Sequence, residues 1–123
     1  MAGPEPEGVS SGSFSGLPAE EPYPGLRRRH FNTERATVNS YEFDAGAEFP
    51  LHKHPQEQLT LVTRGEVRMS LGGATTSLSS GDWSVVPGGI EHGITAGPEG
   101  ATIVAVIMPR RDSVDDYELA QES

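Results

Sequence analysis

Two stretches decide how this sequence folds: GAEFPLHKHPQEQLTLVTRG at residues 46–65 and GDWSVVPGGIEH at residues 81–92. In an extended strand, successive side chains point to opposite faces. His52, His54 and Gln58 share one parity in the first stretch, whereas Glu57 has the other. The alternation therefore predicts that His52, His54 and Gln58 look into one cavity and that Glu57 points away.

His92 ends the second stretch, after the turn that the Pro-Gly-Gly sequence at residues 87–89 predicts. Placed on a neighbouring strand, it would complete a site of three imidazoles and one amide oxygen with His52, His54 and Gln58. Such ligands suit Mn, Fe, Ni, Co or Zn far better than Ca or Mg. The chain has no cysteine, which excludes a thiolate site. We expect these four side chains to bind a divalent transition metal.

Short strands separated by turns account for most of the remaining sequence. The chain has 15 glycines and 10 prolines, which lie between short runs rich in Val, Ile, Leu and Thr. This composition favours strands joined by turns over helices. The expected strands are residues 36–43, 58–62, 66–71, 75–78, 83–86, 92–95 and 102–108. Strands of this length and spacing are typical of a β-sandwich, a jelly roll or a barrel, so we predict an all-β fold.

The two quoted stretches resemble the two sequence motifs of the cupin superfamily. The first reads G-x5-H-x-H-x3-Q-x6-G from Gly46 to Gly65, and the second reads G-x5-P-x-G-x2-H from Gly81 to His92. The resemblance covers roughly residues 36–111. It implies a single-domain metal-binding cupin with a jelly-roll-like β-barrel, similar to small quercetinase-like and uronate-processing cupins.

Gln58 and Ala96 are the two departures from the family pattern. A glutamate ligand is usual at the position of Gln58, although glutamine also occurs in some metal-binding cupins, and an asparagine often stands at the position of Ala96. A neutral amide compensates none of the charge of the cation, so the metal becomes a stronger Lewis acid and an iron centre becomes harder to oxidise. We therefore expect the protein to polarise a small carboxylate- or carbonyl-bearing molecule for isomerisation or elimination.

The sequence VIMPRRD at residues 106–112 is similar to the closing strand of cupins that process unsaturated uronates. In those proteins an arginine after a proline reaches the cavity, which implies that Arg111, or Arg110 next to it, binds a substrate carboxylate. The alternative for both arginines is a solvated domain edge. Those enzymes also carry an acidic residue at the position of Ala105. Tyr41 is a candidate for proton transfer.

Two other functions remain open. One is a metal-dependent dioxygenase of the quercetinase-like type, because the same fold and similar ligands serve oxygen chemistry; oxygen consumption separates it from an isomerase or lyase. The other is a non-catalytic cupin that binds a small ligand, which the lack of an evident general base favours. Loss of turnover with a chelator and in His54→Ala would eliminate this second alternative.

The acidic charge of the chain is concentrated at its ends. The formal net charge is −9, although residues 26–111 carry nine acidic and nine basic side chains. We expect a flexible Gly/Pro/Ser-rich arm at residues 1–25, a cupin β-barrel at residues 26–112 and an acidic tail at residues 113–123. The three arginines at residues 27–29 are expected to form a solvated surface, and the alternative is that they bind an anion.

Composition and pattern also predict partners and location. Nucleic acid or an anionic membrane would require clustered Lys and Arg, so neither is expected as a partner. The sequence has no apolar run of membrane-spanning length and no signal peptide, which favours the cytoplasm. Leu59 and Leu61 lie on the face opposite the ligands, where another chain or the N-terminal arm normally covers such apolar rows. We therefore predict a homodimer to which the arm contributes.

Overall fold

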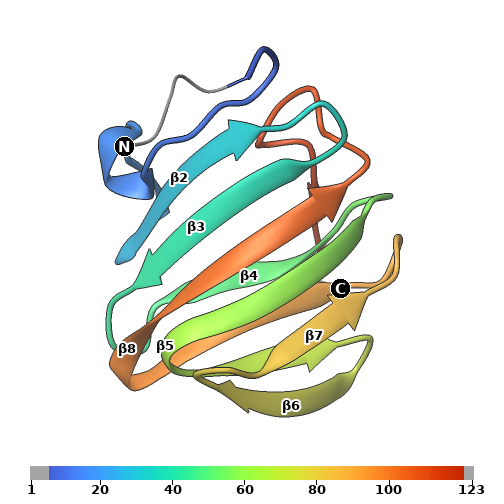
Figure 1. The fold of residues 1–123 in the computed structure, drawn as a ribbon. Helices are drawn as coiled ribbons and strands as arrows, with labels where there is room; N and C mark the ends of the chain where they lie inside the picture. Colours follow the sequence, from blue (N-terminus) through green and yellow to red (C-terminus); the bar gives the residue numbers. More distant parts are fainter. Residues whose placement is uncertain (1–5, 121–123) are drawn as a thin grey trace.

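The protein is described by a computed structural model over residues 6–120, and this part of the chain is mostly antiparallel β-sheet (Figure 1). Its elements are a short 3-10 helix, η1 (Phe14–Gly16), and the strands β1 (Glu20–Tyr23), β2 (Leu26–Asn32), β3 (Thr37–Phe43), β4 (Glu48–Lys53), β5 (Glu57–Leu71), β6 (Ala74–Ser79), β7 (Trp83–Val86), β8 (His92–Met108) and β9 (Glu118–Leu119). The predicted all-β, jelly-roll-like barrel is confirmed.

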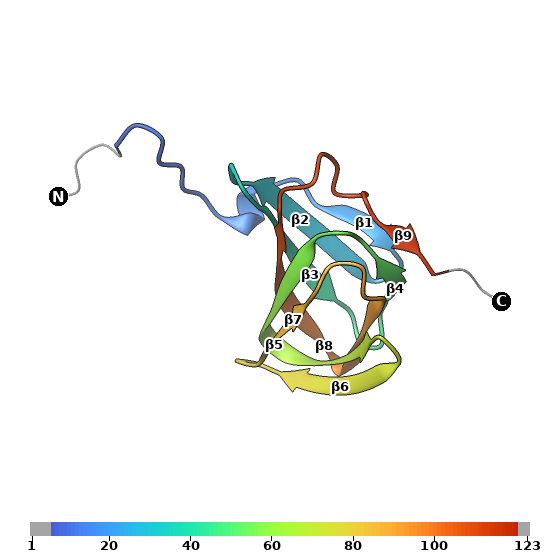
Figure 2. The same ribbon diagram turned by 90° about the vertical axis from the view of Figure 1, so that its right-hand side faces the viewer.

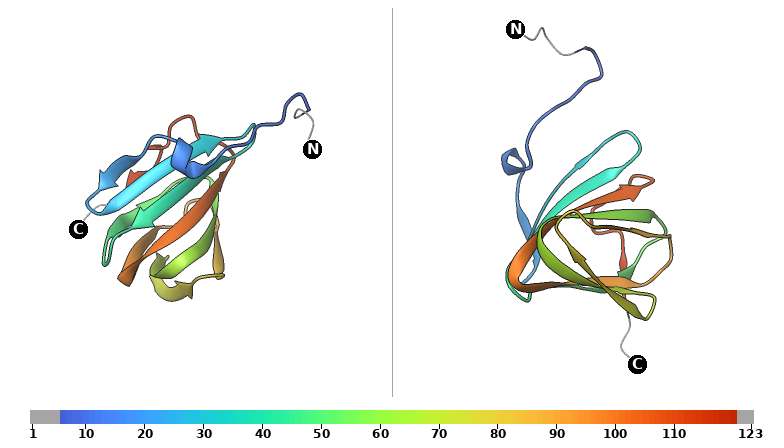
Figure 3. Two further views of the ribbon diagram at one scale, coloured as in Figure 1. Left: turned by 60° about the vertical axis from the view of Figure 1, so that its left-hand side comes forward. Right: turned by 60° about the horizontal axis from the view of Figure 1, so that its bottom comes forward.

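Two long strands, β5 and β8, bend so that each contributes to both layers of the barrel (Figures 2 and 3). Residues 101–107 of β8 pair with β3 and with the first part of β5, whereas residues 92–96 pair with β4 or with the last part of β5. The register of β5 against β8 shifts on either side of Gly65. Gly65 has a φ of 73°, and a Cβ there would collide with the carbonyl oxygen of Gly100, so only glycine fits this bend.

The sequence predicts the parts of these long strands but not their continuity. The expected strands 58–62 and 66–71 are both parts of β5, and those at 92–95 and 102–108 are both parts of β8. Strands β2 and β4 were not predicted. Because Pro50 lies inside β4, the segment that carries His52 does not look like a strand.

The barrel interior has an apolar part and a polar part. Leu26, Phe43, Val67, Met69 and Ile94 are at most 4% exposed and belong to the hydrophobic core. On the same inner face of β3 and β5, the buried side chains nearer the metal motifs are polar: Thr37, Asn39, Gln58 and Thr60. A polar interior patch of this kind is unusual unless the side chains bind one another or a ligand.

Parts of the predicted arm and of the predicted tail contact the barrel. Strand β1, which lies within the predicted arm, pairs with β2, and the ring of Phe14 lies 5.7 Å from that of Phe31. Residues 6–13 lead away from the barrel (Figure 2). Strand β9, in the predicted acidic tail, pairs with β4. The N-terminal and C-terminal segments also contact each other, because the hydroxyls of Tyr23 and Tyr117 lie 2.8 Å apart and form a hydrogen bond.

The three consecutive arginines at residues 27–29 are not all solvated, contrary to the prediction. They lie in β2, where Arg27 and Arg29 form ion pairs with Glu42 on the outer face. Arg28 has the opposite parity and is only 2% exposed. Strand alternation thus overrides the tendency of a charged run to stay in water.

Within residues 6–120, no helix is long and apolar enough to cross a membrane. The cytoplasmic location stays a prediction.

Candidate metal centre

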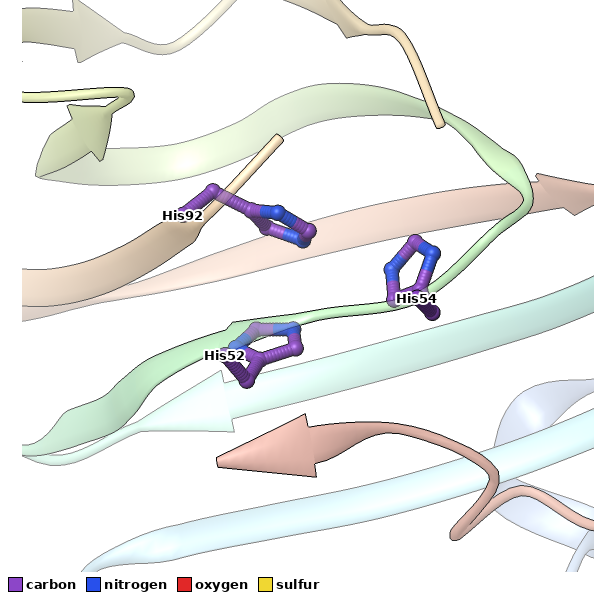
Figure 4. A group of neighbouring side chains, drawn as sticks. All are labelled: His52, His54 and His92. Atoms are coloured by element: carbon purple, nitrogen blue, oxygen red, sulfur yellow. The ribbon is translucent and has the colours of Figure 1, made fainter. Parts of the chain in front are cut away.

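Three histidines from two motifs converge inside the barrel. His52 in β4 is directly opposite His92 in β8, and His54 follows at the end of β4. One ring nitrogen of each lies within 4.8 Å of the others, and Figure 4 shows the rings grouped around a common space. All three side chains are buried, at 1–5% exposed. The structure therefore brings together the histidines that the sequence selected.

Backbone carbonyls fix the orientation of each imidazole. The Nδ1 atoms of His52, His54 and His92 lie 2.8, 3.0 and 2.9 Å from the carbonyl oxygens of Pro50, Gln56 and Ile90, respectively. A carbonyl oxygen only accepts hydrogen bonds, so each Nδ1 carries the proton and donates it. In a neutral ring this leaves the lone pair on Nε2, the atom that faces the shared space.

Gln58 adds a fourth acceptor to the same space. Its Oε1 lies 3.1 Å from Nε2 of His54 and 3.1 Å from Nε2 of His92. Its amide Nε2 donates to Oγ1 of Thr60 at 3.0 Å, which fixes the oxygen toward the histidines. Because the histidine protons are on Nδ1, the lone pairs of the histidine Nε2 atoms face the lone pairs of Gln58 Oε1 with no proton between them. A bound cation removes this repulsion.

The spacing of the acceptors also fits a metal ion. Two ligand atoms that are each about 2.1 Å from one ion and at right angles lie about 3 Å apart. This is close to the 3.1 Å between Gln58 Oε1 and each of the two histidine nitrogens. These residues could therefore hold a transition metal by three nitrogens and one oxygen.

Burial keeps the histidines neutral. It is the main cause that lowers the pKa of His52 from 6.5 to about 3, and the neighbouring His92 lowers it further. Burial likewise lowers the pKa of His54 and that of His92, and the positive charge of Arg111 acts on all three in the same direction. At neutral pH the rings are thus unprotonated at Nε2, as a metal ligand must be.

The second motif packs directly against the loop that carries His54. The backbone N–H of Gly89 donates to the carbonyl of His54 at 2.8 Å. A Cβ on Gly88 would collide with the carbonyl oxygen of Pro55. Any other residue at position 88 would therefore push this loop away and move His54.

Arg111 and Arg110 have opposite environments. Arg111 is 3% exposed, its backbone N–H donates to Oγ1 of Thr37 at 3.0 Å, and its Nη1 donates to the carbonyl of Asp116 at 3.4 Å. Its Nε has no hydrogen-bond partner within the described part of the chain. Arg110 is exposed, with Nη1 3.5 Å from the carbonyl of Thr33. Of the two arginines, only Arg111 is buried in the barrel.

Tyr41 lies on the inner face of β3 and is 6% exposed. Burial raises the pKa of its phenol, while the nearby guanidinium groups of Arg111 and Arg28 act to lower it. The net effect is a raised pKa, so the phenol is protonated at neutral pH.

A cleft of about 630 Å³ at the surface has His54, one of the three histidines, in its lining. One wall is the His54 loop, residues 53–56, and the other is the C-terminal segment, residues 115–118. The ring of Tyr117 in that segment lies 5.2 Å from the ring of Phe49 and 5.2 Å from that of His52. Sequence reasoning missed this segment, because its acidic composition is typical of a solvated tail.

Sequence reasoning also missed Asn39, and it did not distinguish Arg28 from the neighbouring Arg27 and Arg29. Arg28 and Asn39 are buried on the inner face, and the side-chain amide of Asn39 has no hydrogen-bond partner among residues 6–120. Asn39 lies opposite Ala105 in the β3–β8 register, and Ala105 in turn lies opposite Thr60. Strand parity could have found Arg28, but only once β2 was known to be a strand.

Comparisons with known proteins agree with this geometry. The family model described as "Cupin domain" matches residues 39–107. An RmlC-like cupin from Shewanella frigidimarina is 26% identical, with a TM-score of 0.75 over 82% of this chain and 91% of that chain. KdgF from Halomonas sp. is 29% identical, with a TM-score of 0.74 over 83% of this chain and 97% of that chain. No curated protein matches the chain.

A more distant likeness concerns the fold alone. Oxalate decarboxylase from Bacillus subtilis, in a structure at pH 4.6, has a TM-score of 0.79 at 21% identity. The match covers 93% of this chain but only 34% of that chain. This chain therefore corresponds to about a third of the decarboxylase.

Proposed function

This chain belongs to the cupin domain family, and we propose that it is a metal-dependent enzyme acting on a small molecule with a carboxylate or carbonyl group. The observation that carries the proposal is the convergence of Gln58 Oε1 on Nε2 of His54 and of His92, with every Nδ1 proton directed elsewhere. Such an arrangement of acceptors is explained by a cation and is costly without one.

The proposed ligands are His52, His54, Gln58 and His92, and the ion is a divalent transition metal, namely Mn, Fe, Ni, Co or Zn. Bound there, the ion would supply Lewis-acid polarisation of a substrate oxygen. All four ligands are neutral, so none of them compensates the charge of the ion. This favours isomerisation or elimination over chemistry that requires a higher oxidation state.

Arg111 and Tyr41 are the proposed catalytic residues. The buried guanidinium of Arg111 would bind the substrate carboxylate and orient the molecule toward the histidines. The protonated phenol of Tyr41, which lies beside this guanidinium, would donate a proton to the substrate. No Asp or Glu side chain is buried within residues 6–120, so Tyr41 is the best-placed group for proton transfer in the barrel.

The place of Ala105 bears on the substrate. Uronate-processing cupins have an acidic residue there, whereas here the side chain is a methyl group between Asn39 and Thr60. The 29% identity to KdgF supports a related substrate class. We therefore propose a uronate-like hydroxy or keto acid, processed without that carboxylate.

Elemental analysis of protein purified without a metal-chelating tag tests the metal site. Substrate screening with the identified ion then tests the activity. About one equivalent of a transition metal, and turnover that a chelator abolishes and the ion restores, would support the proposal. Stoichiometric oxygen use with a substrate would instead show a dioxygenase. Binding without turnover of any screened acid would favour the non-catalytic alternative.

We also propose a homodimer formed through the outer face of β5 and β7. Leu59 lies opposite Val85 and Leu61 opposite Trp83, which makes a compact apolar patch. Trp83 is 64% exposed and Val85 is 48% exposed. Phe14 of the arm packs on Phe31, at the far edge of the sheet, and leaves this patch open. A second copy of the chain would cover it.

Light scattering at micromolar concentration measures the assembly. We expect twice the 13.1 kDa mass of the chain, and Trp83→Lys is expected to give the single-chain mass. Arg68→Ala, at an exposed polar position on β5, is the control and should remain dimeric. A wild-type protein of single-chain mass would refute the dimer.

A further inference from the structure

Arg28 is a buried cation that the proposed function does not use. It lies on β2 directly opposite Tyr41 of β3 and is 2% exposed, whereas its neighbours Arg27 and Arg29 pair with acids on the outer face. A guanidinium in the interior of a small barrel is costly unless its donors are satisfied. Its position therefore calls for an anionic partner.

The partners that the chain provides for Arg28 are peripheral. Its Nη2 donates to Oδ1 of Asp115 at 3.1 Å, and its Nε lies 3.4 Å from Oε1 of Glu20. The side chains of Asp115 and Glu20 are 66% and 44% exposed, so both carboxylates are largely in water. Residues 6–120 thus provide no buried carboxylate as a partner for Arg28.

Unused donors remain beside Tyr41. Nη1 of Arg28 and Nε of Arg111 are buried and have no hydrogen-bond partner in the described residues. Arg28 lies opposite Tyr41 in the β2–β3 register, and both guanidinium groups interact with the phenol of Tyr41. Arg28 and Arg111 also contact the consecutive residues Asp115 and Asp116, which brings the two arginines close together. No buried carboxylate in residues 6–120 balances these two charges. Two planar guanidinium groups with free N–H donors match the oxygens of a carboxylate.

We propose that Arg28 and Arg111 together bind the substrate carboxylate, and that Asp115 occupies the place of this carboxylate at Arg28 until the substrate arrives. The inference rests on the proposed function only for the part of the substrate that would face the histidines. Asp115 belongs to the segment that forms one wall of the cleft. The substrate therefore exchanges one carboxylate for another at Arg28, and the substrate class is a small acid with its carboxylate at the arginines and a hydroxyl or carbonyl toward the histidines.

Calorimetric titration of the full-length, metal-loaded protein with three probes tests this site: pyruvate, glycolate and galacturonate. Arg28→Gln is expected to weaken binding by at least about tenfold, since charge-assisted hydrogen bonds are lost. Arg28→Lys keeps the charge but not the fork of donors, and should give an intermediate loss. Arg29→Gln, the adjacent outward-facing arginine, is the matched control and should bind as the wild type does.

Asp115→Asn should strengthen probe binding, whereas the Arg28 variants should weaken it. It removes the competing carboxylate from an exposed position, so it should fold normally and bind the probes about two- to fivefold more tightly. This variant decides the question if Arg28→Gln does not fold. Unchanged binding in Asp115→Asn together with unchanged binding in any folded Arg28 variant would overturn the inference, as would failure of the wild type to bind all three probes.

Metal content distinguishes the two proposals. We expect the Arg28 and Asp115 variants to retain the same metal content as the wild type, because neither residue contacts the histidines. Protein that contains no metal but binds the probes through Arg28 would support the carboxylate site and refute the proposed function. If the protein contains its full metal content and the Arg28 and Asp115 variants bind the probes as the wild type does, the carboxylate site is refuted and the proposed metal site stands.

Discussion

The histidine cluster and the arginine pair lie in the same barrel interior, but the protein holds them in different ways. Each histidine donates its Nδ1 proton to a carbonyl within two residues in the chain. Arg28 instead pairs with exposed carboxylates on β1 and on the C-terminal segment, and both arginines keep a buried donor without a partner in the described residues. The first cluster is complete within its own motifs, and the second depends on segments distant in the chain.

This difference separates two tasks. Ligands that are fixed by the local backbone keep their geometry whatever else occupies the barrel, which suits a resident metal. Donors that are left free are available to a molecule that enters and leaves. The proposed metal site and the proposed carboxylate site can therefore be altered separately by substitution.

The largest expected effect is on the histidine cluster. His54→Ala removes a direct ligand and should weaken metal binding by more than about 100-fold, since loss of even an indirect supporting group costs about 10- to 100-fold. Elemental analysis after dialysis against a weak chelator measures this. His30→Ala is the control, because His30 lies outside the cluster and pairs with Glu20. Equal metal content in both variants would argue against the site.

Arg111→Met should affect only the second cluster. We expect KM for a carboxylate substrate to rise by about 10- to 100-fold, through loss of charge-assisted hydrogen bonds, while the metal content stays that of the wild type. Steady-state kinetics together with elemental analysis separates the two effects. Arg110→Met, at the exposed neighbour, should change neither quantity. A loss of metal in Arg111→Met would mean that the two clusters are not independent.

The histidine cluster should also make the metal-free protein sensitive to acid. Burial lowers the pKa of folded His52 to about 3, against 6.5 in the unfolded chain. Below pH 6.5 the unfolded chain therefore binds a proton that the folded chain does not, and the free energy of unfolding falls as the pH falls. His52 alone should account for about 2 kcal/mol between neutral pH and about pH 5.

Urea denaturation of the chelator-treated protein at about pH 7.5 and about pH 5 measures this dependence. In His52→Gln the fall in unfolding free energy between the two pH values should be smaller by about the same 2 kcal/mol. A variant whose stability depends on pH as the wild type's does would show that His52 is not buried in its neutral form.

The smallest effect should come from Thr60→Val. Oγ1 of Thr60 accepts the hydrogen bond that orients the amide of Gln58. Without it the amide can rotate, and metal affinity should fall by about tenfold, with the fold preserved by the similar side-chain shape. A metal competition titration measures the change. Thr75→Val, at an exposed position on β6, is the control. Equal affinities would mean that Gln58 needs no orienting partner.

The metal cluster could be predicted from the sequence because its information is local. Parity within one assumed strand grouped His52, His54 and Gln58, and the second motif supplied His92. The structure divides that segment between β4 and β5 at residues 54–56, so the spacing of the motif, and not one continuous strand, identified the cluster. The arginine pair of the proposed carboxylate site could not be predicted in the same way. Arg28 reaches the interior because it lies on the inner face of β2, which pairs with β3 across the short turn at residues 33–36, and β2 was not predicted as a strand.

The C-terminal segment was missed for a related reason. Its composition predicts a solvated tail, yet Tyr117 packs against Phe49 and β9 pairs with β4. The carboxylates of this segment remain in water, so they do not oppose the packing of Tyr117 and the pairing of β9 with β4. Local composition does not reveal such a contact, because the partner strand lies far away in the chain.

The pairing of β9 with β4 has a practical consequence for anyone who purifies this protein. Leu119 lies opposite His52, and the N–H of Ala120 donates to the carbonyl of Leu51 at 2.9 Å. An oligohistidine tag joined soon after β9 would thus bring additional imidazoles close to the candidate ligands, where they would compete for the ion. A removable tag at the opposite end would avoid this artefact.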